Sequence, residues 1–219
     1  MDQELPKLSR KLRILAVPPN LGGCSFYRLL DPMKKLAKLL PDYVEVKFNA
    51  NPLAWEKTKQ GGYVPNDDPN KMVDIEWCDI VFTCNIHEIG APYNHALLLA
   101  SKKKGKFFHF DTDDLLTDLY EGHRHYENYK KLQLDELTKM MYANANLVSV
   151  TQRKFAERIQ KYVQNGALAI IKNVIDYELP CWNLPKTPSK QVRVGWVGGI
   201  HHEEDVKEFT GVMLAVNAR

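Results

Sequence analysis

The sequence has few cysteines, and their spacing does not suit a metal site or a disulfide framework. Its four cysteines include no CxxC pair, the spacing on which many zinc sites and redox motifs depend. No apolar stretch approaches the roughly 18 residues that a membrane-spanning helix needs, and no signal-peptide pattern precedes the first apolar run. We therefore expect a chain without a membrane span, located in the cytoplasm.

An excess of charge of one sign is also lacking. The 219 residues include 30 Lys and Arg against 27 Asp and Glu, which gives a formal net charge of +3. Such a balance does not indicate a nucleic-acid or membrane surface. Hydrophobic residues make up 44% of the chain, enough for a core, and the length is large for one domain and small for two.

Short apolar runs alternate with helical patterns along most of the chain. Helical periodicity covers residues 92–103, 126–145 and 152–163, and we expect residues 49–70 to contain a short helix or to line a binding surface. Strand patterns occupy residues 12–17, 43–48, 79–83, 107–110, 147–150 and 168–171. Strands alternating with helices predict an α/β fold with a Rossmann-like, doubly wound parallel sheet.

The composition changes near residue 177. Pro180, Pro185 and Pro188 indicate a linker, because prolines clustered between patterned segments are typical of loops. A new strand pattern, a glycine loop and a helical pattern follow it. We therefore predict an N-terminal domain over residues 1–176, a linker over 177–191, and the start of a second Rossmann-like domain over 192–219.

Three carboxylates follow the strand pattern that ends at Phe110. Because they follow the end of a strand, we expect them at the carboxyl edge of the sheet, where ligands bind in open α/β folds. They are Asp111, Asp113 and Asp114. They are the candidate catalytic residues, able to orient a substrate hydroxyl, accept its proton or stabilise a positive charge. The alternative is that Asp113 or Asp114 caps the next helix. His109, in the same strand pattern, is interpreted as a core histidine.

Other polar candidates follow strand patterns as well. Gly22-Gly23 and Gly198-Gly199 each come between a strand pattern and a helical pattern, where bare N–H groups suit an anion; the alternative is a tight turn. Arg28 pairs either with a phosphate or with an acid such as Asp31. Asn173 lines a cleft between domains or belongs to a turn.

The order of these features resembles the glycosyltransferases of the GT-B architecture, in particular the retaining family 4 (group 1) enzymes and their phage-type relatives. No single motif is specific to this family, but the order and spacing of the motifs over residues 12–209 are more specific. The matching pieces are Gly22-Gly23-Cys24 with Tyr27-Arg28 and Pro32, Phe110 to Leu115, Ala145 to Thr151, Lys172 to Asp176, and Gly195 to Gly199 followed by His202 and Asp205.

The resemblance implies transfer of a sugar from a nucleoside-diphosphate sugar to an acceptor hydroxyl, without a required divalent metal. The acceptor is expected on the first domain and the donor mainly on the second, near Gly198-Gly199, His202 and Asp205. The family's basic pair is replaced here by His201-His202-Glu203-Glu204. Its paired glutamates would fall beyond Arg219, so we expect an incomplete donor domain, completed by a longer chain or by a partner chain.

Other classes of protein share parts of this pattern. Asp111-Thr112-Asp113 matches the DxD of metal-dependent GT-A transferases, whose carboxylates bind a divalent cation on the diphosphate. The same residues are similar to the DxDxT motif of haloacid-dehalogenase-like phosphatases, in which the first Asp attacks phosphorus, but Leu115 stands at the Thr position. A non-catalytic Rossmann-like binding module is the third alternative.

Overall fold

The computed structural model describes residues 8–65, 72–87, 89–123, 126–185, 188 and 203–217. The chain divides into two compact units, Met1–Ile175 and Asp176–Arg219. The elements of the first unit are β1 Leu12–Val17, α1 Gly23–Ser25, η1 Phe26–Leu30, α2 Asp31–Leu39, β2 Val44–Phe48, β3 Trp55–Lys57, β4 Tyr63–Pro65, α3 Val73–Trp77, β5 Ile80–Cys84, α4 Ala91–Lys103, β6 Phe107–Thr112, α5 Tyr126–Lys131, α6 Leu134–Asn144, β7 Leu147–Val150, α7 Arg153–Ile159, η3 Gln160–Tyr162 and β8 Ala167–Ile170. The second unit contains η4 Pro180–Trp182 and α8 Glu203–Asn217.

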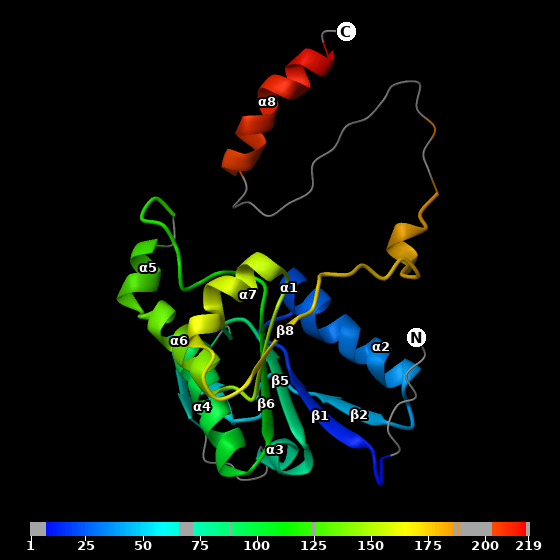
Figure 1. Ribbon diagram of the computed structural model, residues 1–219, viewed down its shortest axis with the longest axis vertical. Helices are drawn as coiled ribbons and strands as arrows, with labels where there is room; N and C mark the ends of the chain where they lie inside the picture. Colours follow the sequence, from blue (N-terminus) through cyan, green and yellow to red (C-terminus); the bar gives the residue numbers. More distant parts are fainter. Residues whose placement is uncertain are drawn as a thin grey trace. The chain divides into compact units, whose positions relative to one another are not determined.

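A six-stranded parallel sheet forms the centre of the first unit (Figure 1), in the order β2-β1-β5-β6-β7-β8. This confirms the predicted parallel sheet. The chain adds β2 on one side of β1 and then β5 to β8 on the other. The strand order therefore reverses between β1 and β5, which makes the carboxyl edge there a topological switch point, the usual ligand crevice of such sheets.

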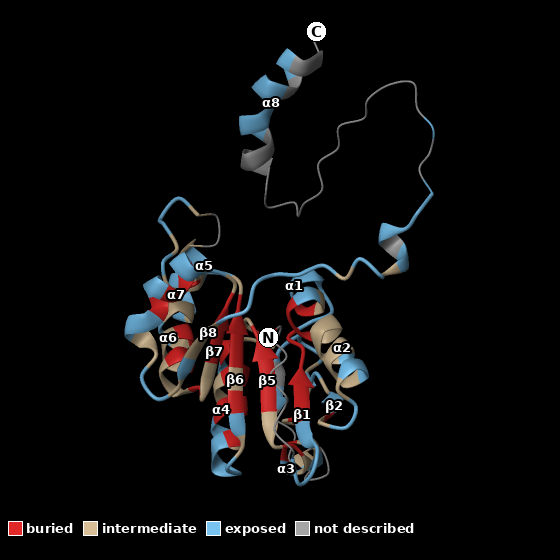
Figure 2. Ribbon diagram, turned by 45° about the vertical axis from the view of Figure 1, so that its right-hand side comes forward, coloured by how far each residue is buried: buried red, intermediate tan, exposed pale blue. Residues whose placement is uncertain are grey.

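Helices cover both faces of this sheet, as in a doubly wound fold. Side chains alternate between the faces along a strand, so Ile14 and Ala16 of β1 pack with α2. Leu15 and Val17, on the opposite face, belong to the larger core that α4 and α6 complete. Figure 2 shows the buried residues concentrated along the central strands. The burial of both faces explains why these strands are nearly continuous apolar runs.

The helix that follows β1 contains a wide turn. It runs through α1, η1 and α2, and η1 is a π-helical turn in which the N–H of Asp31 bonds to the carbonyl of Phe26. In a regular α-helix, the ring of Pro32 would clash with the carbonyl four residues earlier, that of Arg28. The π-turn accommodates the proline, and such turns are frequent at functional sites.

Two expected helical segments differ in the structure. The pattern over residues 126–145 forms two helices, because Gln133 takes a left-handed conformation with a φ of 52°. Within residues 49–70, the described part forms the antiparallel hairpin β3–β4 rather than a helix. The amide of Asn51 bonds to the backbone of Trp55, and the Trp55 ring packs edge-on against Tyr93, which holds the hairpin to α4.

The expectation that Asp113 or Asp114 caps the next helix is wrong. The segment after β6 is irregular, and α5 begins only at Tyr126.

In the second unit, α8 begins at Glu203, and Asp205 is its third residue. The predicted strand 192–197, Gly198-Gly199 and His202 lie outside the described residues. None of the described helices combines the length and the hydropathy that crossing a membrane requires.

Candidate functional site

A buried ion pair joins Arg28, on the π-turn, to Asp111, near the end of β6. Arg28 Nε donates to Asp111 Oδ2 at 2.8 Å, and Nη2 donates to Oδ1 at 2.5 Å. Only 3% of the Arg28 side chain and 1% of the Asp111 side chain are exposed. Asp111 is thus an internal partner of Arg28 rather than an acid exposed at the edge, and Arg28 pairs with this acid rather than with Asp31.

The same guanidinium holds the segment that follows β8. Arg28 Nη1 donates to the backbone carbonyl of Ile171 at 2.7 Å and to Asn173 Oδ1 at 3.0 Å. Asn173, a candidate binding residue, is therefore a partner of Arg28. One side chain connects the helix after β1, the end of β6 and the exit from β8, three segments that are far apart in the sequence.

A short polar chain continues from Asp111 along one face of the sheet. Ser149 Oγ, on β7, donates to Asp111 Oδ1 at 2.5 Å. His109 Nε2 lies 2.7 Å from Ser149 Oγ, so the imidazole donates its Nε2–H to a hydroxyl whose own proton is engaged. The His109 ring stacks on Phe82, with centroids 4.4 Å apart. These contacts agree with the interpretation of His109 as a core histidine.

Burial and charge act against each other within this cluster. Burial raises the pKa of Asp111 above its ordinary value, and the hydrogen bonds from Arg28 and Ser149 oppose the rise. Burial alone would lower the pKa of Arg28, but its bonds to Asp111 raise it overall. The pKa of His109 falls to about 4 because of burial and, next, the Arg28 charge. The imidazole is therefore neutral at pH 7, and Arg28 remains charged.

Asp113 lies in a different environment from Asp111. Its side chain is half-buried, and its Oδ1 accepts a hydrogen bond from Asn85 Nδ2 at 2.7 Å. Asn85 directly follows β5 and has a left-handed φ of 51°. The neighbouring Asp114 is exposed.

The first glycine loop approaches these two acids. Burial, then the charge of Asp113 and a hydrogen bond with its side chain, and then the charge of Asp114 raise the pKa of Cys24 to about 11. The exposed Cys24 therefore lies near both carboxylates. The side chain of Asn20 shapes the loop, because its Oδ1 accepts from the Gly22 N–H at 2.8 Å and from Ser25 Oγ at 3.0 Å. The loop after β1 and the ends of β5 and β6 therefore meet at the switch point.

The glycines of this loop differ in the space around them. A Cβ on Gly22 would approach Asn20 Oδ1 to 3.0 Å, whereas a Cβ on Gly23 would meet nothing within 4 Å. The space where a Gly23 side chain would lie is therefore open.

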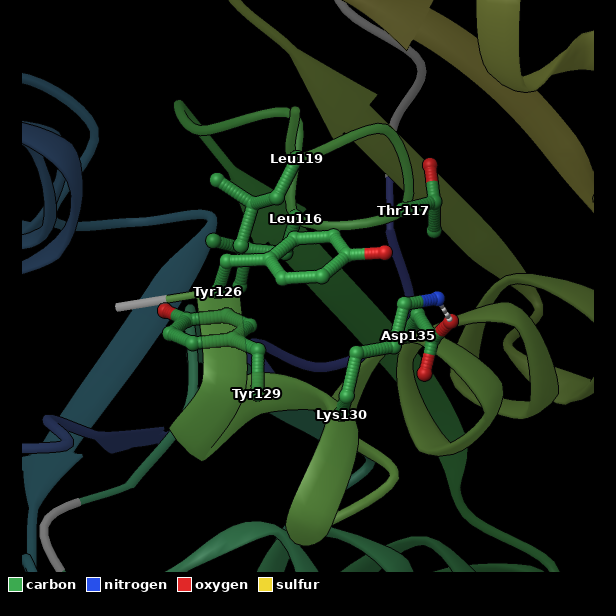
Figure 3. Close-up of a pocket in the computed structure, with 7 residues that line it drawn as sticks. All are labelled: Leu116, Thr117, Leu119, Tyr126, Tyr129, Lys130 and Asp135. Atoms are coloured by element: carbon green, nitrogen blue, oxygen red, sulfur yellow. Dashed lines mark hydrogen bonds and ion pairs between the residues drawn. The ribbon is translucent and has the colours of Figure 1, made fainter. Parts of the chain in front are cut away.

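A small hollow lies beyond Asp114, between the segment after β6 and α5 (Figure 3). Its volume is about 20 Å³, enough for about one water molecule. The Lys130–Asp135 ion pair, 2.7 Å long, lies at one side. At this volume the hollow does not accommodate a sugar. Its lining residues are Leu116, Thr117, Leu119, Tyr126, Tyr129, Lys130 and Asp135.

Comparison with known proteins found no relative of this chain. No protein-family model matches the chain, and a search of curated proteins found no similar sequence. Within the described ranges, no group of three or more His, Cys, Asp or Glu residues is arranged to hold a metal ion. The fold and the site define an α/β protein with a Rossmann-like parallel sheet and a polar, acidic cluster at its switch point.

The predicted site residues fall into three groups. Arg28, Asp111 and Asn173 form the buried cluster. Asp113 and Asp114 lie beside the loop that carries Gly22 and Gly23. Gly198, Gly199 and His202 lie outside the described residues, and Asp205 lies in α8.

The sequence interpretation missed Asn20, Asn85 and Ser149. Asn85 could have been predicted, since it directly follows a predicted strand at the same edge of the sheet as the acids. Nothing in the sequence marks Ser149 as a site residue, because it lies within an apolar strand pattern and its partner comes from β6.

Proposed function

We propose that the chain belongs to a glycosyltransferase that moves a sugar from a nucleoside-diphosphate sugar to an acceptor hydroxyl, and that its first unit binds the acceptor. The observation that supports the proposal most is the meeting of the glycine loop, Asn85 and the two acids Asp113 and Asp114 at the switch point. The order of sequence features that resembles GT-B enzymes agrees with this assignment.

The charge of this site favours a hydroxyl over a phosphate. Asp113 and Asp114 lie close enough to Cys24 to raise the pKa of its thiol, so an anion at the first glycine loop would meet the same repulsion. Carboxylates accept hydrogen bonds from hydroxyl groups. We therefore assign Gly22-Gly23 to the acceptor and leave the donor diphosphate to the second unit.

The two environments give the acids different roles. Asp113 is reachable, and as a carboxylate it orients the acceptor hydroxyl or takes its proton, the role of a general base. Asp111 is closed off by Arg28 and Ser149, so we assign it to the scaffold. Asp114 is exposed and adds negative charge beside the acceptor.

The burial of Asp111 also weighs against two alternatives. In a DxD transferase, the first Asp helps to bind the cation, and in a dehalogenase-like phosphatase it attacks phosphorus. Here both Asp111 oxygens accept hydrogen bonds from Arg28. Either role would require Asp111 to leave a buried, charge-paired position, which is costly because it strands the Arg28 charge.

Calorimetric and thermal-shift titration with UDP, GDP and their sugars, with and without magnesium, tests the proposal. A ligand that binds only the native state raises its stability in proportion to ln(1 + [L]/Kd). Saturable, metal-independent stabilisation by one nucleotide supports the transferase and names its donor. A strict requirement for magnesium contradicts the proposal, and so does the absence of any response once the donor domain is complete.

A further inference from the structure

Asn85 and Asp113 bond to each other in both directions. Asn85 Nδ2 donates to Asp113 Oδ1 at 2.7 Å, and the Asp113 backbone N–H points back to Asn85 Oδ1 at 3.4 Å. The amide group of one residue therefore faces both the side chain and the backbone of the other. This arrangement fixes the rotation of the carboxylate as well as its position.

The backbone of Asn85 is itself held on both sides. Its N–H donates to the carbonyl of Asp111 at 2.8 Å, which extends the pairing of β5 with β6. Its carbonyl accepts from Asn94 Nδ2 at 2.9 Å, and the Asn94 side chain is buried. The left-handed φ of 51°, which asparagine tolerates better than most residues, turns the side chain toward Asp113.

We infer that Asn85 is a positioning residue that holds the Asp113 carboxylate beside the glycine loop, in the orientation that meets the substrate hydroxyl. The role of Asp113 toward a hydroxyl rests on the proposed function, whereas its position rests on the hydrogen bonds alone. Without Asn85, the carboxylate would rotate among several conformations, and the productive one would be populated only part of the time.

The exposed thiol of Cys24 provides a probe that does not depend on catalysis. Its pKa of about 11 contains a contribution from the Asp113 charge, so a carboxylate that moves away must lower it. The experiment is the pH profile of iodoacetamide alkylation at Cys24, read peptide by peptide by mass spectrometry on the full chain. Only the thiolate reacts, so the midpoint of the profile gives the pKa and the plateau gives accessibility.

The informative variant is Asn85→Gly, because glycine accepts the positive φ and only the side-chain amide is lost. Asp113→Asn serves as the reference for complete loss of the charge. Gln133→Gly is the matched control, since it replaces another residue with positive φ, between α5 and α6.

We expect the midpoint to fall in Asp113→Asn, to fall by part of that amount in Asn85→Gly, and to stay unchanged in Gln133→Gly. At pH 8.5, the alkylation rate of Asn85→Gly should rise at least about threefold, since a full pKa unit corresponds to tenfold. An unchanged midpoint in Asn85→Gly overturns the inference, and so does a higher plateau with an unchanged midpoint, which would report only a looser loop.

The result is separable from the proposed function. If the midpoint shifts as expected and no nucleotide binds once the donor domain is complete, Asn85 positions Asp113 and the transferase proposal fails. If nucleotide binding is found and the midpoint of Asn85→Gly equals that of the unchanged chain, the transferase proposal stands and the inference fails.

Discussion

Arg28 and Asp111 are 83 residues apart in the sequence and form a two-point ion pair beneath the carboxyl edge of the sheet, with donor–acceptor distances of 2.8 and 2.5 Å. The pair connects the helix after β1 to β6, on either side of the switch point. It therefore determines how the glycine loop and the strand that carries the acids lie relative to each other. We therefore expect the Arg28–Asp111 pair to stabilise the structure of the site.

Arg28→Leu should destabilise the chain strongly. Removing one partner of a buried pair leaves an uncompensated charge, with a typical cost of about 3–5 kcal/mol, and Asp111 would be that charge. The measurement is the free energy of unfolding from urea denaturation at pH 7.

The control for this variant is Arg158→Leu. Arg158 also pairs with an aspartate, Asp118, at 2.8 Å, but the two side chains are 67% and 47% exposed. Exposed pairs contribute less than about 1 kcal/mol. Equal, small losses in the two variants would show that the Arg28–Asp111 pair is not buried in solution.

His109 should make the stability depend on pH between about 4 and 6.5. Its folded pKa is lowered to about 4 from 6.5, so in this interval the unfolded chain binds more protons than the native one. Stability therefore rises with pH across the interval. The contribution is complete above pH 6.5 and is lost as the pH falls toward 4, with a total of up to about 3 kcal/mol at 1.36 kcal/mol per unit.

The matched variant is His109→Gln, which keeps a side-chain N–H donor for Ser149 and has no titrating group. Urea denaturation of both proteins at pH 4.5, 5.5 and 7 gives the difference in slope. A parallel loss of stability in the two proteins would assign the pH dependence to other groups.

Gly166→Ala should destabilise the fold, whereas Gly23→Ala should not. A Cβ on Gly166 would lie 2.3 Å from the carbonyl oxygen of Ala145, a backbone atom that cannot rotate away. The cost of such overpacking is typically about 1–3 kcal/mol. The space around Gly23 is open, so thermal melting should show little change there.

Gly23→Ala also tests the role assigned to the loop. If the acceptor approaches the bare backbone at this position, the added methyl group should weaken acceptor binding without loss of stability. Acceptor binding equal to that of the unchanged chain would assign Gly22-Gly23 to a tight turn.

The fold was largely predictable from the sequence because its central strands are buried on both faces. Burial on both faces produces apolar runs with clear ends, and the strand pattern at residues 12–17 matches β1 at both ends. The breaks in helices were harder to predict. A single left-handed residue, Gln133, divides a continuous helical pattern, and glutamine carries no sequence signal for that conformation.

The site was predicted less well, for a physical reason. Asp111 and Asp113 are the same type of residue and lie two positions apart. Their roles differ because their partners come from different distant segments. Arg28 reaches one, and Asn85 reaches the other. Pairings over 83 and 28 residues depend on the order of strands in the sheet, which residue spacing does not encode.

The assignment of Asp113 as the reacting carboxylate is tested most directly by measuring nucleoside-diphosphate release from UDP- and GDP-sugars, in the presence of hydroxyl acceptors, by the unchanged chain and by Asp113→Asn. Once a longer chain or a partner chain completes the donor domain, we expect release by the unchanged protein and a loss of about 10²-fold or more in Asp113→Asn, with the melting temperature of the variant nearly unchanged. No release from any donor under that condition, or equal release by the two proteins, would contradict the assignment.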